Sequence, residues 1–146
     1  MSAGDYAGTY DATKVIVTIG GIIITGFADG DYIKAKRSSD LYTKYVGADG
    51  EVSRSKTADK SGEIEVILGQ TSSSNDELSA MFNLALLGGV DGTFPIGVVD
   101  LSGRSVIAAA NCWLRTAPEA TFGVEISERS WMFDTASLSY QIGGNG

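Results

Sequence analysis

Two glutamates, Glu63 and Glu65, are the pair of side chains in this sequence that most resembles an acid–base site. They lie two residues apart, so on a β-strand both carboxylates project from the same face, roughly 6.5 to 7 Å apart. Two carboxylates at such a distance can hold a water molecule between them, as in inverting glycosidases. The same alternation is typical of a strand whose outer face is solvated, and no aromatic sugar platform or third acid lies nearby in the sequence. The pattern therefore favours solvation over catalysis.

The sequence lacks the residues on which most enzymatic and metal sites depend. It contains no histidine, which removes Ser-His and Cys-His nucleophile pairs and histidine-ligated zinc. It also contains no GxxxxGK[ST], GxGxxG, CxxC or GxSxG motif. The Asp-Gly pairs at residues 29–30, 49–50 and 91–92 lack the alternating ligands and closing glutamate of a calcium loop, so they indicate turns. We therefore predict no catalytic, cofactor-binding or metal-binding residue and no enzymatic activity.

Length and charge bound the class of protein. The 146 residues suit a single domain. The 11 basic and 18 acidic residues give a net charge of −7, so the average surface repels phosphate backbones. Such a surface does not grip nucleic acid, although it suits a conduit to which DNA does not adhere. The start of the chain has no cationic region and the most apolar run, residues 15–24, is short, so neither a signal peptide nor a membrane span is predicted.

Periodicity predicts a mainly β chain. The β-branched residues on both sides of Gly20-Gly21 indicate a hairpin. Downstream of Glu63, Ile64, Val66 and Leu68 should share a buried face. The single cysteine, Cys112, is predicted to be a small buried strand residue on the same face as Ala110, in a strand that packs closely on both sides. The predicted strands cover residues 14–25 as the hairpin, 32–37 continuing over 41–46, 63–68, 94–100, 105–115 and 128–142.

One helix is predicted over residues 75–87. Ser74 and Glu77 form a capping-box pattern at its start, and Gly88-Gly89 supplies the stop signal. Its apolar residues recur at helical spacing and form a single stripe that can cover one side of a β core. The residues expected to pack there are Leu78, Met81, Phe82 and Leu86.

A polar segment, residues 47–62, separates two of the predicted strands. Connections longer than roughly 12 to 15 residues are uncommon in compact domains unless they are functional or disordered. We therefore predict a long protruding loop, not a simple hairpin turn, that contacts a partner through paired charges. Its charged residues are Asp49, Glu51, Arg54, Lys56, Asp59 and Lys60.

The remaining features point to assembly. Residues 1–13 are small, polar and rich in glycine, which is typical of an N-terminal arm that orders on a partner. Many short strands with 19 glycines, two prolines and one helix predict two packed antiparallel sheets, a sandwich or barrel, with one flanking α-helix. Strands rich in Val, Ile and Ala must have their edges covered, and closure of a homo-oligomer is one way to do so. We therefore predict self-association.

Four parts of the sequence together resemble a family of bacteriophage proteins. They are residues 24–30, 47–55, 70–76, and 122–125 with 129–131. In this order they are similar to tail tube proteins of contractile-tailed phages, and the resemblance covers nearly the whole chain, from residue 10 to residue 144. These segments are patterns of folding and contact, not active-site signatures.

The resemblance implies a fold and an assembly. The fold would be the one shared with the tube proteins of type VI secretion, and homo-hexameric rings would stack into a hollow conduit for DNA passage inside a contractile sheath. Residues 47–62 match the loop that reaches the adjacent ring, so the six charged residues given above become predicted inter-ring contacts. Glu63 and Glu65 become candidates for a net-negative lumen. Residues 1–13 and the C-terminal tail 143–146 would add contacts between subunits.

The resemblance also implies partners and a location. The partners would be further copies of the chain, the tail sheath protein facing the helix, the tape measure protein, the baseplate and tail terminator proteins, and transient non-specific DNA, with no membrane. The protein would belong to the virion, in the phage tail, after assembly in the host cytoplasm. The competing interpretations are a small β-sandwich binding module, a component of a tail-like particle, and a carboxylate-dependent hydrolase.

Overall fold

The computed structural model describes residues 8–88 and 92–144. Most of the predicted N-terminal arm, together with Gly89 and the end of the C-terminal tail, therefore lies outside the described residues. Within the described part, a short 3-10 helix at Ala12–Lys14 precedes the first strand. The strands are β1 (Val15–Ile19), β2 (Ile22–Ile23), β3 (Ile33–Arg37), β4 (Tyr42–Val46), β5 (Val52–Lys56), β6 (Gly62–Gly69), β7 (Phe94–Asp100), β8 (Val106–Thr116), β9 (Glu128–Thr135) and β10 (Ser139–Gln141), and the helix is α1 (Ser74–Leu86).

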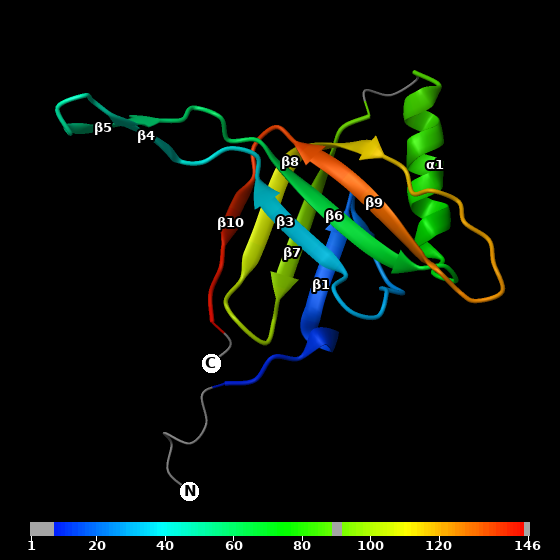
Figure 1. The fold of residues 1–146 in the computed structure, drawn as a ribbon. Coiled ribbons are helices and arrows are strands. Elements are labelled where there is room, and N and C mark those ends of the chain that lie inside the picture. The colour runs from blue at the N-terminus through cyan, green and yellow to red at the C-terminus, as the bar shows by residue number, and fades with distance from the viewer. Residues whose placement is uncertain (1–7, 89–91, 145–146) are drawn as a thin grey trace, which may run out of the picture.

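Eight of the strands form one antiparallel sheet in the order β2-β1-β7-β8-β9-β6-β3, with β10 paired to β8. This sheet folds over on itself, so that β1, β7 and β8 form one layer and β3, β6 and β9 lie across them in a second layer (Figure 1). The strands β4 and β5 form a separate two-stranded sheet. The predicted class is confirmed: the chain is mainly β, with two antiparallel sheets and one flanking helix. The prediction that residues 41–46 continue the strand at 32–37 is wrong, because β4 pairs only with β5.

Strand β8 turns the corner between the layers by means of a β-bulge. Its register with β7 pairs Ala109 with Ile96 but Cys112 with Phe94, which places one extra residue in β8. Alternation therefore shifts at this point, so that Ala109 and Cys112 are buried whereas Ala110 is exposed. The prediction that Ala110 and Cys112 share a face, in a strand packed on both sides, is wrong for this reason.

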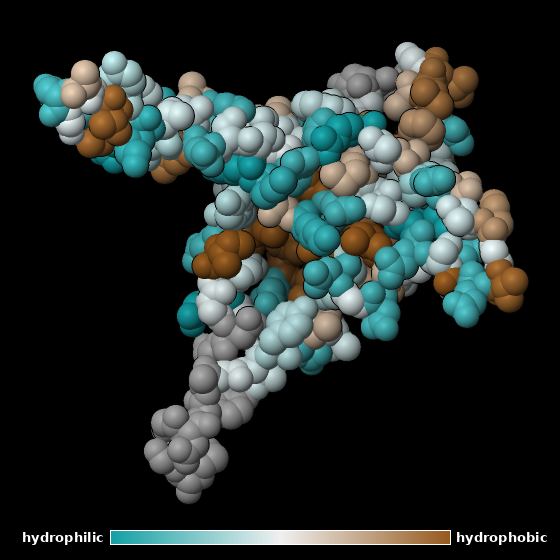
Figure 2. Space-filling model, in the orientation of Figure 1, coloured by the Kyte–Doolittle hydropathy of each residue, from teal (hydrophilic) through white to brown (hydrophobic). Residues whose placement is uncertain are grey.

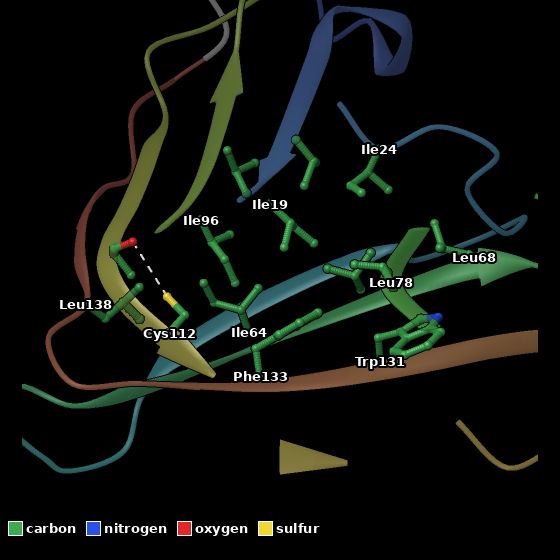
Figure 3. Packing of buried hydrophobic residues seen from close by; sticks show 14 residues of the cluster. Ile19, Ile24, Ile64, Leu68, Leu78, Ile96, Cys112, Trp131, Phe133 and Leu138 are labelled. Carbon is green, nitrogen blue, oxygen red and sulfur yellow. Dashed lines mark hydrogen bonds between the residues drawn. The ribbon is translucent and has the colours of Figure 1, made fainter. Parts of the chain in front are cut away.

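The core lies between the two layers (Figure 3). Ile64, Val66 and Leu68 are fully buried, as predicted. The first two lie opposite Phe133 and Trp131 of β9 in register. Cys112 is also buried, as predicted, and burial raises the pKa of its thiol to about 11. The predicted strand at 128–142 is divided into β9 and β10, because the chain turns inward between them and buries Leu138.

Helix α1 covers one side of the folded sheet but differs from its prediction at both ends. The capping box is wrong: the Ser74 hydroxyl accepts a hydrogen bond from the Thr25 amide at 3.0 Å, which ties the helix to the sheet instead. Leu78 is buried as predicted, and Met81 and Phe82 are partly buried. Leu86 is 68% exposed, so its predicted packing is wrong. An apolar groove of about 340 Å³ separates this end of the helix from the ends of β8 and β9.

Candidate assembly interface

Strands β4 and β5 form a hairpin that projects from the body of the molecule (Figure 1). We call residues 42–56 the arm. Every residue of its two strands is exposed. The prediction of a long loop over residues 47–62 is wrong, because Val46 pairs with Val52 and leaves only a tight turn between them. In that turn the Gly47 amide donates to the Glu51 carbonyl at 2.7 Å.

The two faces of the arm differ in chemistry. Residues directly opposite in an antiparallel pair share a face, and so do residues two apart along a strand. The pairing of Lys44 with Arg54 and of Tyr42 with Lys56 thus places all three cations on one side. The Arg54 guanidinium lies 4.2 Å from the centre of the Tyr42 ring, which agrees with this assignment. We call this side the cationic face; it consists of Tyr42, Lys44, Val46, Val52, Arg54 and Lys56.

The opposite face of the arm is uncharged and rich in hydroxyl groups. It consists of Thr43, Tyr45, Ser53 and Ser55. No ion pair within residues 8–88 and 92–144 involves Lys44, Arg54 or Lys56. Apolar and hydrophilic residues lie side by side along the arm (Figure 2).

The six charged residues predicted as contacts do not form one cluster. Asp49 and Glu51 lie in the turn at the tip, and the Asp49 carboxylate accepts a hydrogen bond from the Glu51 amide at 3.1 Å. Arg54 and Lys56 lie on the cationic face of β5. Asp59 and Lys60 lie between β5 and β6, at the base of the arm. Lys44 was not singled out in the sequence analysis. Its spacing two residues after Tyr42 in an extended segment places it on the same face as Tyr42 and Arg54.

Asp59 braces the base of the arm. Its carboxylate accepts hydrogen bonds from the hydroxyls of Ser39 and Ser61, each at 2.6 Å, and from the Ser61 amide at 2.9 Å. The hydrogen bond from Ser39 is the largest of the causes that lower the pKa of Asp59 to about 2. Nearby, the Lys60 carbonyl accepts a hydrogen bond from the Leu138 amide at 2.9 Å. Asp59 therefore makes contacts within its own subunit, and the inter-ring contact predicted for it stays a prediction.

Glu63 and Glu65 lie on the outward face of β6, among basic residues of the neighbouring strands. The Glu63 carboxylate contacts Arg115 at 2.5 Å and Lys36 at 3.5 Å. The hydrogen bond from Arg115 is the main cause that lowers the pKa of Glu63. Glu65 is 4.0 Å from Lys34.

This outward face is electrically balanced. Arg115 also lies 3.4 Å from Asp134, so three acids face three bases. This face is therefore neutral within the subunit, and the predicted place of Glu63 and Glu65 in a lumen stays a prediction. Glu63 contacts two cations and Glu65 contacts one, an arrangement that suits solvation of an outer face.

The described residues offer no alternative site for chemistry. The apolar groove beneath α1 is lined by residues such as Met81, Phe94 and Trp131, with no converging titratable groups. Within residues 8–88 and 92–144, no three acidic or cysteine side chains are grouped to hold a metal ion. In the same part of the chain, no helix has the length and apolar character that crossing a membrane requires.

The described residues form a folded-over β-sheet with one flanking helix and a projecting two-stranded hairpin. The comparison with protein families identifies the class of protein. The family model described as Bacteriophage PhiTE tail tube protein matches residues 7–143, so the chain belongs to this family of phage tail tube proteins. The chain is also 32% identical over 124 residues to the structural protein ORF10 of Pseudomonas phage KPP10, covering 84% of this chain and 71% of that protein. It is thus a structural component of a phage tail and not an enzyme.

Solved structures share the fold. The sheath–tube complex of the PVC extracellular contractile injection system contains a chain that is 15% identical, with a TM-score of 0.67 over 97% of this chain and 98% of that one. The sheath/tube terminator of the same system gives a TM-score of 0.62 at 15% identity, over 92% and 97% of the two chains. The tube-terminating cap of the anti-feeding prophage gives 0.60 at 13% identity, over 93% of each chain. These likenesses confirm the tail tube fold.

Proposed function

We propose that this chain forms hexameric rings that stack into the hollow tube of a contractile phage tail, and that DNA passes through this tube. The observation that carries the proposal is the arm. A two-stranded sheet exposed on both faces is not stable by itself in water. Its conformation is therefore best explained by contacts with a neighbouring ring. The charged residues of this contact would be Asp49, Glu51, Arg54, Lys56, Asp59 and Lys60, together with Lys44.

The remaining surfaces have roles in the same proposal. The sheath protein would contact α1, where Leu84, Leu86 and Leu87 are exposed. The neutral outward face around Glu63 and Glu65 would line the lumen. Residues 1–13 and 143–146 would join neighbouring subunits. The tape measure protein would fill the lumen before DNA does, and the baseplate and tail terminator proteins would cap the two ends of the tube. The tube would assemble in the host cytoplasm.

Deletion of the arm tests the proposal. The Thr57 amide donates to the Leu41 carbonyl at 2.9 Å, so the two chain ends that remain after removal of residues 42–56 are adjacent and a short Gly-Ser linker can join them. The arm contributes nothing to the core, so we expect the deleted protein to fold with an unchanged thermal transition. Negative-stain electron microscopy should show hollow rods for the full chain and no rods for the deletion. Rods of ordinary length from the deleted protein would contradict the proposal.

A further inference from the structure

At the end of the sheet opposite the arm, the exposed charges contributed by three segments are all acidic. Strand β6 runs from Gly62, near the base of the arm, to Gly69, so about 24 Å separates the two ends. Three segments meet around Gly69: its amide donates to the Gly26 carbonyl, its carbonyl accepts from the Asn75 side chain, and the Gln70 amide donates to the Ser127 carbonyl. We call their exposed acids the acidic end. They are Asp29, Asp31, Asp76, Glu77, Glu119, Glu125 and Glu128.

No cation offsets these acids from within the same segments. Residues 25–31, 70–77 and 117–128 contain neither lysine nor arginine. The next base along the chain, Arg129, is only 9% exposed. Its guanidinium points into the 117–128 loop, where it donates to the Thr121 carbonyl at 3.0 Å and to the Ser127 hydroxyl at 2.6 Å. Arg129 therefore shapes the loop and leaves its outer surface negative.

The acidic end also exposes apolar side chains. Phe122, Val124 and Ile126 are each more than two-thirds exposed, and they alternate along the loop that Arg129 holds. The cationic face of the arm has the matching composition. Its three cations lie beside Tyr42, Val46 and Val52. Each surface thus offers exposed apolar area together with charges of one sign, and the two signs are opposite.

We propose that the cationic face of the arm docks on the acidic end of a second copy of this chain in the adjacent ring. This inference rests on the proposed stacking of rings and names the two surfaces that meet. Because the surfaces lie at opposite ends of the subunit, they cannot pair within one copy, and their pairing gives every ring the same direction. Opposite charges fix this register and disfavour arm-to-arm and end-to-end contacts. The tip acids Asp49 and Glu51 lie beyond Val46 and Val52, past the cationic part of the arm.

A charge-exchange experiment tests the docking. The arm variant carries Lys44→Glu, Arg54→Glu and Lys56→Glu, so both of its surfaces are negative. The end variant carries Asp29→Lys, Asp31→Lys, Glu119→Lys, Glu125→Lys and Glu128→Lys, so its five new lysines outnumber the two acids that are kept and both of its surfaces are positive; Asp76 and Glu77 are kept because acids favour the first turn of a helix. We expect neither variant alone to form rods and an equimolar mixture to form rods in which the two proteins alternate. A third variant, with Thr43→Glu, Ser53→Glu and Ser55→Glu on the opposite face of the arm, should still form rods.

The possible results separate a failure of the docking from a failure of the proposed stacking of rings. Rods from either charge variant alone, or no rods from the mixture of two folded variants, would overturn the docking. If either variant fails to fold, the wild-type protein provides the test: its critical concentration for rod formation should rise roughly tenfold between 0.05 and 0.5 M salt, since screening weakens exposed charge pairs. A critical concentration that does not respond to salt would also overturn it. Absence of rods from the wild-type protein at any salt concentration would instead contradict the proposed stacking itself.

Discussion

At the scale of single residues, the base of the arm depends on two positions, Asp59 and Gly62, whose contacts lie within the subunit. Asp59 ties the chain segments on both sides of the arm through Ser39 and Ser61. Gly62 lies where a Cβ atom would come within 2.6 Å of the Leu138 side chain and 2.8 Å of the Lys36 carbonyl. A side chain at position 62 would therefore displace buried Leu138, which explains the glycine at the start of β6.

The carboxylate of Asp59 predicts a pH dependence at this site. Its pKa of about 2 lies below the ordinary value of 3.8. A lowered pKa means that the hydrogen bonds stabilise the base of the arm above about pH 4 and that this stabilisation is lost as the pH falls towards 2. We expect the Ser61 amide resonance in NMR spectra to titrate with a midpoint near pH 2, and Asp59→Asn to abolish the titration. A midpoint at the ordinary value would show that the three hydrogen bonds do not persist in solution.

At the scale of elements, α1 provides a matched pair of substitutions on one helix. Leu78 is 2% exposed beneath the helix, whereas Leu86 is 68% exposed in its last turn. Leu78→Ala should lower the free energy of unfolding by about 2 to 5 kcal/mol, because it leaves a cavity in the core. Leu86→Ala should change the free energy of unfolding by less than about 0.5 kcal/mol. Urea unfolding of the subunit, at protein concentrations below those at which rods form, measures both values. Equal changes in the free energy of unfolding would mean that the helix does not bury Leu78 in preference to Leu86.

The elements also show what periodicity can and cannot predict. The Gly20-Gly21 hairpin and the buried face of β6 were predictable, because β-branched residues alternate there and one face enters the core. The arm was not, because both faces of β5 are exposed and its strand pattern therefore contains no apolar alternation. The bulge in β8 was also hidden, since it is set by pairing with β7 near Pro95 and not by the sequence of β8 itself. The candidate site was predicted in position but not in form.

At the scale of the whole molecule, charge is distributed unevenly around a net of −7. A group of exposed acids lies at the acidic end, the arm has a cationic face, and the ion pairs around Glu63 and Glu65 make that face neutral. A neutral lining would let DNA pass without adhering to it, since there would be few counterions to release on contact. The net charge of the chain is therefore a poor guide to the charge of any one surface.

This distribution predicts how the lumen responds to substitution if the neutral face lines it. Glu63→Gln with Glu65→Gln would give this face a surplus of two cations on every subunit of a ring, so we expect tubes of this variant to retain short double-stranded DNA that nuclease cannot reach. The retention should fall steeply with salt concentration. Lys34→Gln with Lys36→Gln changes the same face in the opposite direction and should retain no more DNA than the wild-type tube. Equal protection of DNA by all three tubes would place this face away from the channel, and the lining would then have to be sought on the outer face of β1, β7 and β8.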